Sequence, residues 1–160
     1  MRLEGTRWGE LVEVDNVMSQ NFSALRQWML PSLLRVEAAS SRAFYPHRMF
    51  EAGEVARPDA THPLGSRTVM VLGGMIAHAD AHFSEVHSCL DTLMYYLDQA
   101  YSLEPIQHPS FLAGRVGSVV FGGKQVGVIG ELHPEVLEKW QISVPAVALE
   151  IDLTELAERS

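Results

Sequence analysis

Two apolar runs on either side of a glycine pair constrain the fold of this chain more than any other feature. In "GSVVFGGKQVGVIG" (117–130), Gly122 and Gly123 separate two segments rich in β-forming residues. Adjacent glycines supply the positive φ angles of a tight turn, so the segment predicts a β-hairpin. A hairpin joins antiparallel neighbours, and the chain should therefore contain an antiparallel sheet.

Further segments have the composition of strands. They are "RMFEAGEV" (48–55), "RTVMVLGGMIA" (67–77) and "PAVALEIDL" (145–153). In the last of these, apolar residues alternate with Ala148, Glu150 and Asp152, which predicts one buried face and one wetter face. Because the strands follow one another through short turns and the helices are grouped elsewhere, we expect an α+β fold, an antiparallel sheet flanked by helices.

Two stretches have the apolar spacing of helices. Residues 19–42 place apolar side chains on one face, but Pro31 interrupts the run and should either kink it or begin a second helix. Residues 84–103 carry the longest apolar stripe and should form the longest helix, with Asp91 off the stripe and in solvent.

Length, charge and cysteine content narrow the class of protein. The 160 residues suit one domain, and the formal charge of −8 argues against a free-standing nucleic-acid-binding module. The single cysteine, Cys89, excludes an intramolecular disulfide and a thiolate zinc cluster, and its helical position predicts a buried, inert thiol. The first ten residues lack the apolar core of a signal peptide, and no apolar run approaches the ~20 residues of a membrane span. We expect a cytoplasmic protein with no membrane partner.

A histidine cluster, "HADAHFSEVH" (78–87), is the first candidate for chemistry. His78 and His82 are four residues apart, the spacing of zinc proteases, but Ala79 stands where that motif has its general-base glutamate. The cluster also lies where a strand ends and a helix begins, and Asp80 and Ser84 would make good caps. Polar loop and cap residues are therefore favoured over a metal site.

The second candidate is "VIGELHPEVLEKW" (128–140), in which Glu131, His133 and Glu135 occupy alternate positions. The pattern resembles an acid–base or metal site. However, Pro134 interrupts the strand and favours a helix that begins there, with Glu135 in its first turn facing the positive end of the helix dipole. A metal enzyme that combines the two histidines above with Glu131 or His133 is the less favoured alternative.

Several stretches, in order, resemble the C-terminal, catalytic-like part of the β subunit in the phenylalanyl-tRNA synthetase family. The most specific piece is "GELHPEVL" (130–137). The full set is Asn16 followed by Leu25-Arg26, "LPSLL" (30–34), "FEAGEV" (50–55), "HPSFLAGR" (108–115), "GVIGELHPEVL" (127–137) and "VALEIDL" (147–153). The chain departs from the family pattern at Val17, where proline is usual, and at Val116-Gly117, where Ser-Ala is usual.

The resemblance implies a class II aminoacyl-tRNA synthetase-like fold that performs no aminoacylation itself. In the family the α subunit holds ATP, phenylalanine and the tRNA acceptor end, and the β module packs against α within an α2β2 enzyme. We therefore expect the α subunit as partner, tRNA only through the whole enzyme, ATP and Mg²⁺ in its other parts, and no catalytic, cofactor-binding or metal-binding residue here. The segment "FEAGEV" agrees, since it has an acidic residue where an arginine would clamp phosphate.

Structural or interface roles are expected for a set of residues in the family motifs. They are Arg26, Pro31, Glu51, Gly53, Arg115, Gly130, Glu131, His133 and Pro134. Arg26, on the first predicted helix, should form hydrogen bonds or an ion pair. Arg115 should do the same, with Glu51 or Glu131 as its partner. For both arginines the alternative is a solvated side chain.

Residues 1–160 should form a single domain, excised from a longer β subunit or forming its C-terminal part. The source would be archaeal-type or a trimmed bacterial subunit, and the isolated domain would be catalytically inactive and could form a homodimer. A stand-alone binding or regulatory protein with the same fold is the alternative function.

Overall fold

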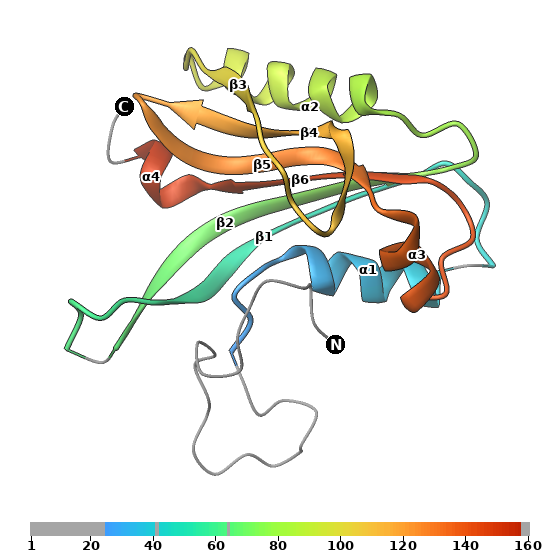
Figure 1. Cartoon of the computed structure of the whole chain (residues 1–160), viewed down its shortest axis with the longest axis horizontal. Helices are drawn as coiled ribbons and strands as arrows, with labels where there is room; N and C mark the ends of the chain where they lie inside the picture. Colours follow the sequence, from blue (N-terminus) through green and yellow to red (C-terminus); the bar gives the residue numbers. More distant parts are fainter. Residues whose placement is uncertain (1–24, 41, 64, 158–160) are drawn as a thin grey trace, which may run out of the picture.

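A computed structural model describes residues 25–40, 42–63 and 65–157 of the chain. One antiparallel sheet runs through the whole domain, with its strands in the order β1-β2-β6-β5-β4-β3 (Figure 1). The strands are β1 (His47–Pro58), β2 (Ser66–Ala77), β3 (Ser102–Pro105), β4 (Phe111–Phe121), β5 (Lys124–Leu132) and β6 (Ala146–Asp152). The helices are α1 (Leu30–Ala39), α2 (Phe83–Tyr96), α3 (Pro134–Lys139) and α4 (Leu153–Ala157). The predicted α+β sheet is confirmed.

The glycine pair forms the predicted hairpin. Gly122 and Gly123 have φ angles of 57° and 75° and join β4 to β5, with Phe121 paired to Lys124 across the turn. Two other glycines of β5 lie where strands approach closely. A methyl group at Gly130 would lie 2.8 Å from the carbonyl oxygen of Arg115, and one at Gly127 would collide with the carbonyl oxygen of Glu150.

Strand β6 lies in the middle of the sheet and is buried at every residue. The expectation of a wetter face is therefore wrong. Helix α2 covers one face of the sheet and α1 lies against the other, so both faces of β6 are covered (Figure 1). Ala146 and Ala148 belong to the apolar core on the α1 side, and Val147, Leu149 and Ile151 belong to the core on the α2 side.

Pro31 lies at the start of a helix and does not kink one, which agrees with the second of the two alternatives predicted for it. It occupies the first turn of α1, where its missing N–H costs no intrahelical hydrogen bond. Residues 25–29 are not helical, so the helix predicted over 19–42 is wrong there. Its residues 19–24 lie outside the described part of the chain, as does Asn16 of the family pattern.

Helix α2 is shorter than predicted. It ends at Tyr96, and Asp98 has a φ angle of 54°, which takes the backbone out of the helix. The residues beyond it form β3, which pairs with β4 from Ser102 to Pro105. Tyr101 therefore lies outside the helix, and its hydroxyl donates to Oδ1 of Asp91 at 2.5 Å. Edge pairing with β4 thus overrides the helical spacing. Among the described residues, no helix is long and apolar enough to cross a membrane.

Candidate functional site

The Glu-x-His-Pro-Glu segment ends a strand and starts a helix, as predicted. Glu131 is near the end of β5, His133 is the N-cap of α3, and Pro134 is its first residue. Nδ1 of His133 accepts a hydrogen bond from the backbone N–H of Glu135 at 3.3 Å. The histidine therefore satisfies one of the free donors of the first helical turn.

Glu131 has a second structural role that its sequence position does not reveal. Its Oε1 accepts the backbone N–H of Phe83, the first residue of α2, at 3.0 Å. A carboxylate at this place satisfies a free N–H and faces the positive end of the helix dipole. Glu131 thus connects the central part of the sheet to the start of α2, across 48 positions of sequence.

The two histidines of the first candidate lie around one carboxylate. His78 follows β2, and His82 is the N-cap of α2, so the two do not share a helical face. Nε2 of His78 lies 2.9 Å from Oε1 of Glu85, and Nδ1 of His82 lies 3.2 Å from the same atom. The hydrogen bond from His78 lowers the pKa of Glu85.

These contacts make the histidine cluster a capping arrangement. Glu85 also accepts the backbone N–H of His82 at 3.3 Å, which places it in a capping box at the start of α2. His82, and not the expected Asp80 or Ser84, holds the cap position. The part of the chain that the structure describes contains no group of three or more metal-ligating side chains. The hypothesis of a histidine metal enzyme therefore has no ligand set there.

Arg26 forms the predicted ion pair, although it lies in a non-helical segment. Its Nη1 is 2.6 Å from Oε1 of Glu51, and its Nε donates to the carbonyl oxygen of Glu54 at 3.1 Å. A methyl group at Gly53 would lie 2.7 Å from Nη2 of Arg26, so glycine leaves room for the guanidinium. Arg26, Glu51 and Gly53 together attach the segment before α1 to strand β1.

Arg115 does not form the predicted ion pair. Its side chain is exposed, Glu51 is bound to Arg26, and Glu131 accepts from Phe83. Arg115 lies where the pairing of β4 with β5 shifts register between Phe111 and Val116. Its exposure agrees with the alternative of a solvated side chain. The expectation of a buried Cys89 is also wrong, because that thiol is exposed on α2.

Two acidic residues of β6 were assigned to a wetter face and are in fact the most deeply buried polar groups of the sheet. Glu150 is 2% exposed, and its Oε2 accepts the backbone N–H groups of Met29 at 2.8 Å and Leu30 at 3.1 Å. Burial raises the pKa of Glu150 to about 7. Asp152, also 2% exposed, pairs with Nη1 of Arg57 at 2.8 Å.

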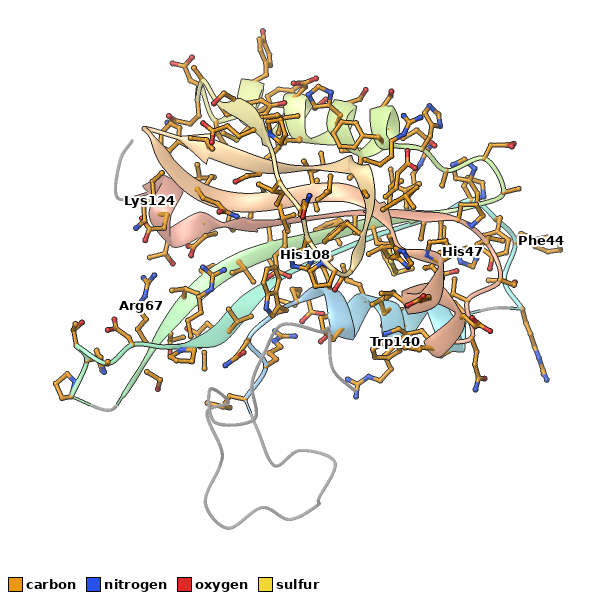
Figure 2. All side chains as sticks on the ribbon, in the orientation of Figure 1. Phe44, His47, Arg67, His108, Lys124 and Trp140 are labelled. Carbon is orange, nitrogen blue, oxygen red and sulfur yellow. The ribbon has the colours of Figure 1, made fainter. Side chains whose placement is uncertain are left out.

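Asp152 and two further acidic residues fix the helices to the sheet. Oδ1 of Asp152 accepts the N–H of Glu155 at the start of α4, and Glu155 is itself bound by Lys124 of β5 at 2.5 Å (Figure 2). Glu37 of α1 is 1% exposed and lies 2.8 Å from Nδ1 of His47 at the start of β1. Every carboxylate of this set connects one element to another.

The comparisons with known proteins decide the family. Residues 1–153 match the family model described as the phenylalanyl tRNA synthetase beta chain CLM domain. The chain belongs to this family. Its relatives include the phenylalanine–tRNA ligase beta subunits of Thermococcus gammatolerans, 42% identical over 92% of this chain, and of Treponema pallidum, 38% identical over 90% of it. The domain spans about a quarter of their length, 26% and 24% respectively.

Solved structures agree on the fold of the β-chain CLM domain. The pyrrolysyl-tRNA synthetase of Desulfitobacterium hafniense aligns with 93% of this chain and 52% of its own, with a TM-score of 0.67 and 21% sequence identity. That likeness confirms the class II synthetase-like fold and carries no conclusion about activity. The family motifs "FEAGEV" and "GELHPEVL" lie on β1 and on the β5–α3 connection, where their polar residues hold elements together.

Proposed function

We propose that the chain is a non-catalytic, class II synthetase-like domain of a phenylalanyl-tRNA synthetase β subunit. It supports assembly with the catalytic α subunit for aminoacylation of tRNA(Phe) in the cytoplasm, and tRNA, ATP and Mg²⁺ are engaged by other parts of the α2β2 enzyme. The Arg26–Glu51 pair carries the proposal. An arginine bound to a carboxylate of β1 presents no cationic clamp to a phosphate, and phosphoryl chemistry depends on such clamps.

The surface available to the α subunit is the face of β1 and β2 opposite α1. Phe50 is 79% exposed and Met70 is 40% exposed. The antiparallel register sets Phe50 opposite Gly74 and Glu54 opposite Met70, so both apolar side chains lie on one face. Gly73, one residue along, faces the α1 side, where a methyl group would meet Met29. Exposed apolar groups gathered on a sheet face are typical of a protein interface.

Co-expression with the α subunit tests this proposal. The chain should co-purify with α, and Phe50→Asp should lower the yield of the complex about fivefold or more, because a charge is costly in an apolar interface. Tyr95→Asp is the matched control, since Tyr95 is 80% exposed and belongs to α2 and not to β1 or β2. Equal yields from the chain and both variants would contradict the proposed surface. A homodimer that excludes α, measured by light scattering, would support a stand-alone protein instead.

A further inference from the structure

A hollow of about 420 Å³ lies on the α1 side of the sheet, next to the segment that leads into α1. Its wall includes Trp28 before the helix, Arg57 at the end of β1, Gln125 and Val128 of β5, and Glu150 of β6. Trp28 packs edge-on against His108, which lies between the sheet and the start of α1 (Figure 2). The volume falls within the range of small-molecule sites in proteins.

One carboxyl oxygen of this wall has no hydrogen-bond partner among the described residues. Oε2 of Glu150 accepts two backbone N–H groups, whereas Oε1 is buried and unpaired. Buried polar atoms are almost always hydrogen-bonded, so an unpaired carboxyl oxygen beside a hollow indicates a missing donor. A molecule that enters the hollow can supply that donor.

The charges around the hollow favour a cation. Arg57 is paired with Asp152 at 2.8 Å, and Arg26 is paired with Glu51 at 2.6 Å. Among the described residues, Glu150 forms no ion pair, so no cationic side chain contacts its carboxyl group directly, although Arg57 and Arg26 act on it from a greater distance. The ring of Trp28 supplies an apolar surface that also attracts cations.

We propose that this hollow binds small organic ammonium ions that carry an apolar or aromatic body. The ammonium group donates to Oε1 of Glu150, and the body lies against Trp28 and Val128. A ligand that also carries a carboxylate brings a second negative charge close to Glu150 and binds more weakly. The inference goes beyond the proposed function, which requires no ligand in this domain.

Calorimetric titration of the chain with 2-phenylethylamine at pH 8 tests the inference. We expect saturable binding of this ammonium ion. Two probes share its phenyl body: 2-phenylethanol lacks the charge, and phenylalanine adds a carboxylate. Both should bind at least about tenfold more weakly than the amine. 2-Phenylethanol cannot form the charge-assisted hydrogen bond, and the carboxylate of phenylalanine is repelled by the carboxylate of Glu150. Absence of saturable amine binding, or equal affinity for all three probes, would overturn the proposal.

Variants locate the binding. Glu150→Gln should weaken binding of the amine about tenfold, because the charge is lost while an oxygen remains for the two N–H donors. Glu37→Gln is the matched control: Glu37 is also buried with one unpaired oxygen, but it is not part of the wall.

Gln125→Trp, at an exposed position of the wall, should block the hollow without altering the core. Unchanged affinity in Gln125→Trp, or equal losses in the two glutamate variants, would show that the amine binds elsewhere. Assembly with the α subunit should be the same in all of these variants.

Discussion

Two helices of this domain begin against a glutamate of the sheet, and the two glutamates differ in how much water surrounds them. Glu131 accepts one N–H at the start of α2 and is partly exposed. Glu150 accepts two N–H groups at the start of α1 and is 2% exposed. Solvent lies beside the first carboxylate, whereas the residues that donate to the second, Met29 and Leu30, are buried. The same kind of hydrogen bond should therefore contribute very differently to stability at the two sites.

Removal of the buried glutamate should have the largest effect. Glu150→Ala leaves the N–H groups of Met29 and Leu30 buried without an acceptor and creates a cavity, so we expect a loss of about 4 kcal/mol in the free energy of unfolding. Urea denaturation of the chain and the variant measures it. A loss of less than about 1 kcal/mol would mean that water reaches the start of α1 and that the two sites are alike.

The pH dependence of stability should come next. Burial raises the pKa of Glu150 from 4.5 to about 7 in the folded chain. Between these values the folded state keeps a proton that the unfolded state has released, so stability falls as the pH rises from about 4.5 to 7. The pKa difference corresponds to at most about 3 kcal/mol.

The comparison with Glu150→Gln isolates this contribution from the histidines and other carboxylates. Glutamine retains the oxygen that accepts from α1 and cannot ionise. The stability difference between the chain and this variant, measured at pH 5 and at pH 8, should shift in favour of the variant at the higher pH. A difference that stays constant between the two values would show that Glu150 titrates in the folded chain as it does in the unfolded one.

The partly exposed glutamate should give the smallest effect. Glu131→Ala removes one acceptor at the start of α2, for which we expect a loss of about 1 kcal/mol, the usual contribution of a capping side chain. Glu138→Ala, at an exposed position of α3, is the control and should change stability by less than about 0.5 kcal/mol. Thermal unfolding of the three proteins measures both values. A loss at Glu131 as large as that at Glu150 would remove the distinction between the two sites.

The sequence predicts those parts of the fold that depend on local backbone chemistry. Gly122-Gly123 marks the hairpin turn because few other residues tolerate its φ angles, and Pro31 and Pro134 each begin a helix because they lack an N–H. The ion pair of Arg26 was also expected, although its partner and its non-helical backbone were not. The family motifs added the class II arrangement, which local patterns alone do not distinguish from other antiparallel folds.

Long-range packing accounts for what the sequence did not reveal. Alternation in "VALEIDL" is the same for a strand covered on one face as for one covered on both, so nothing in the segment showed that Glu150 and Asp152 would be buried. Their partners, the N–H groups at the start of α1 and the guanidinium of Arg57, lie about 100 residues away in sequence. Likewise, Ser102–Pro105 became β3 because β4 offered an open edge.

Steric constraints in the sheet explain the two glycines, Gly127 and Gly130, of the motif "GVIGELHP" (127–134). Their neighbours in the sheet leave no space for a side chain: the carbonyl oxygen of Glu150 lies beside one, and that of Arg115 beside the other. Any descendant that keeps this sheet is therefore expected to keep both glycines, whatever its function. A search for "GxxGELHP" thus finds proteins that share a fold, and an assay is needed to find those that share a function.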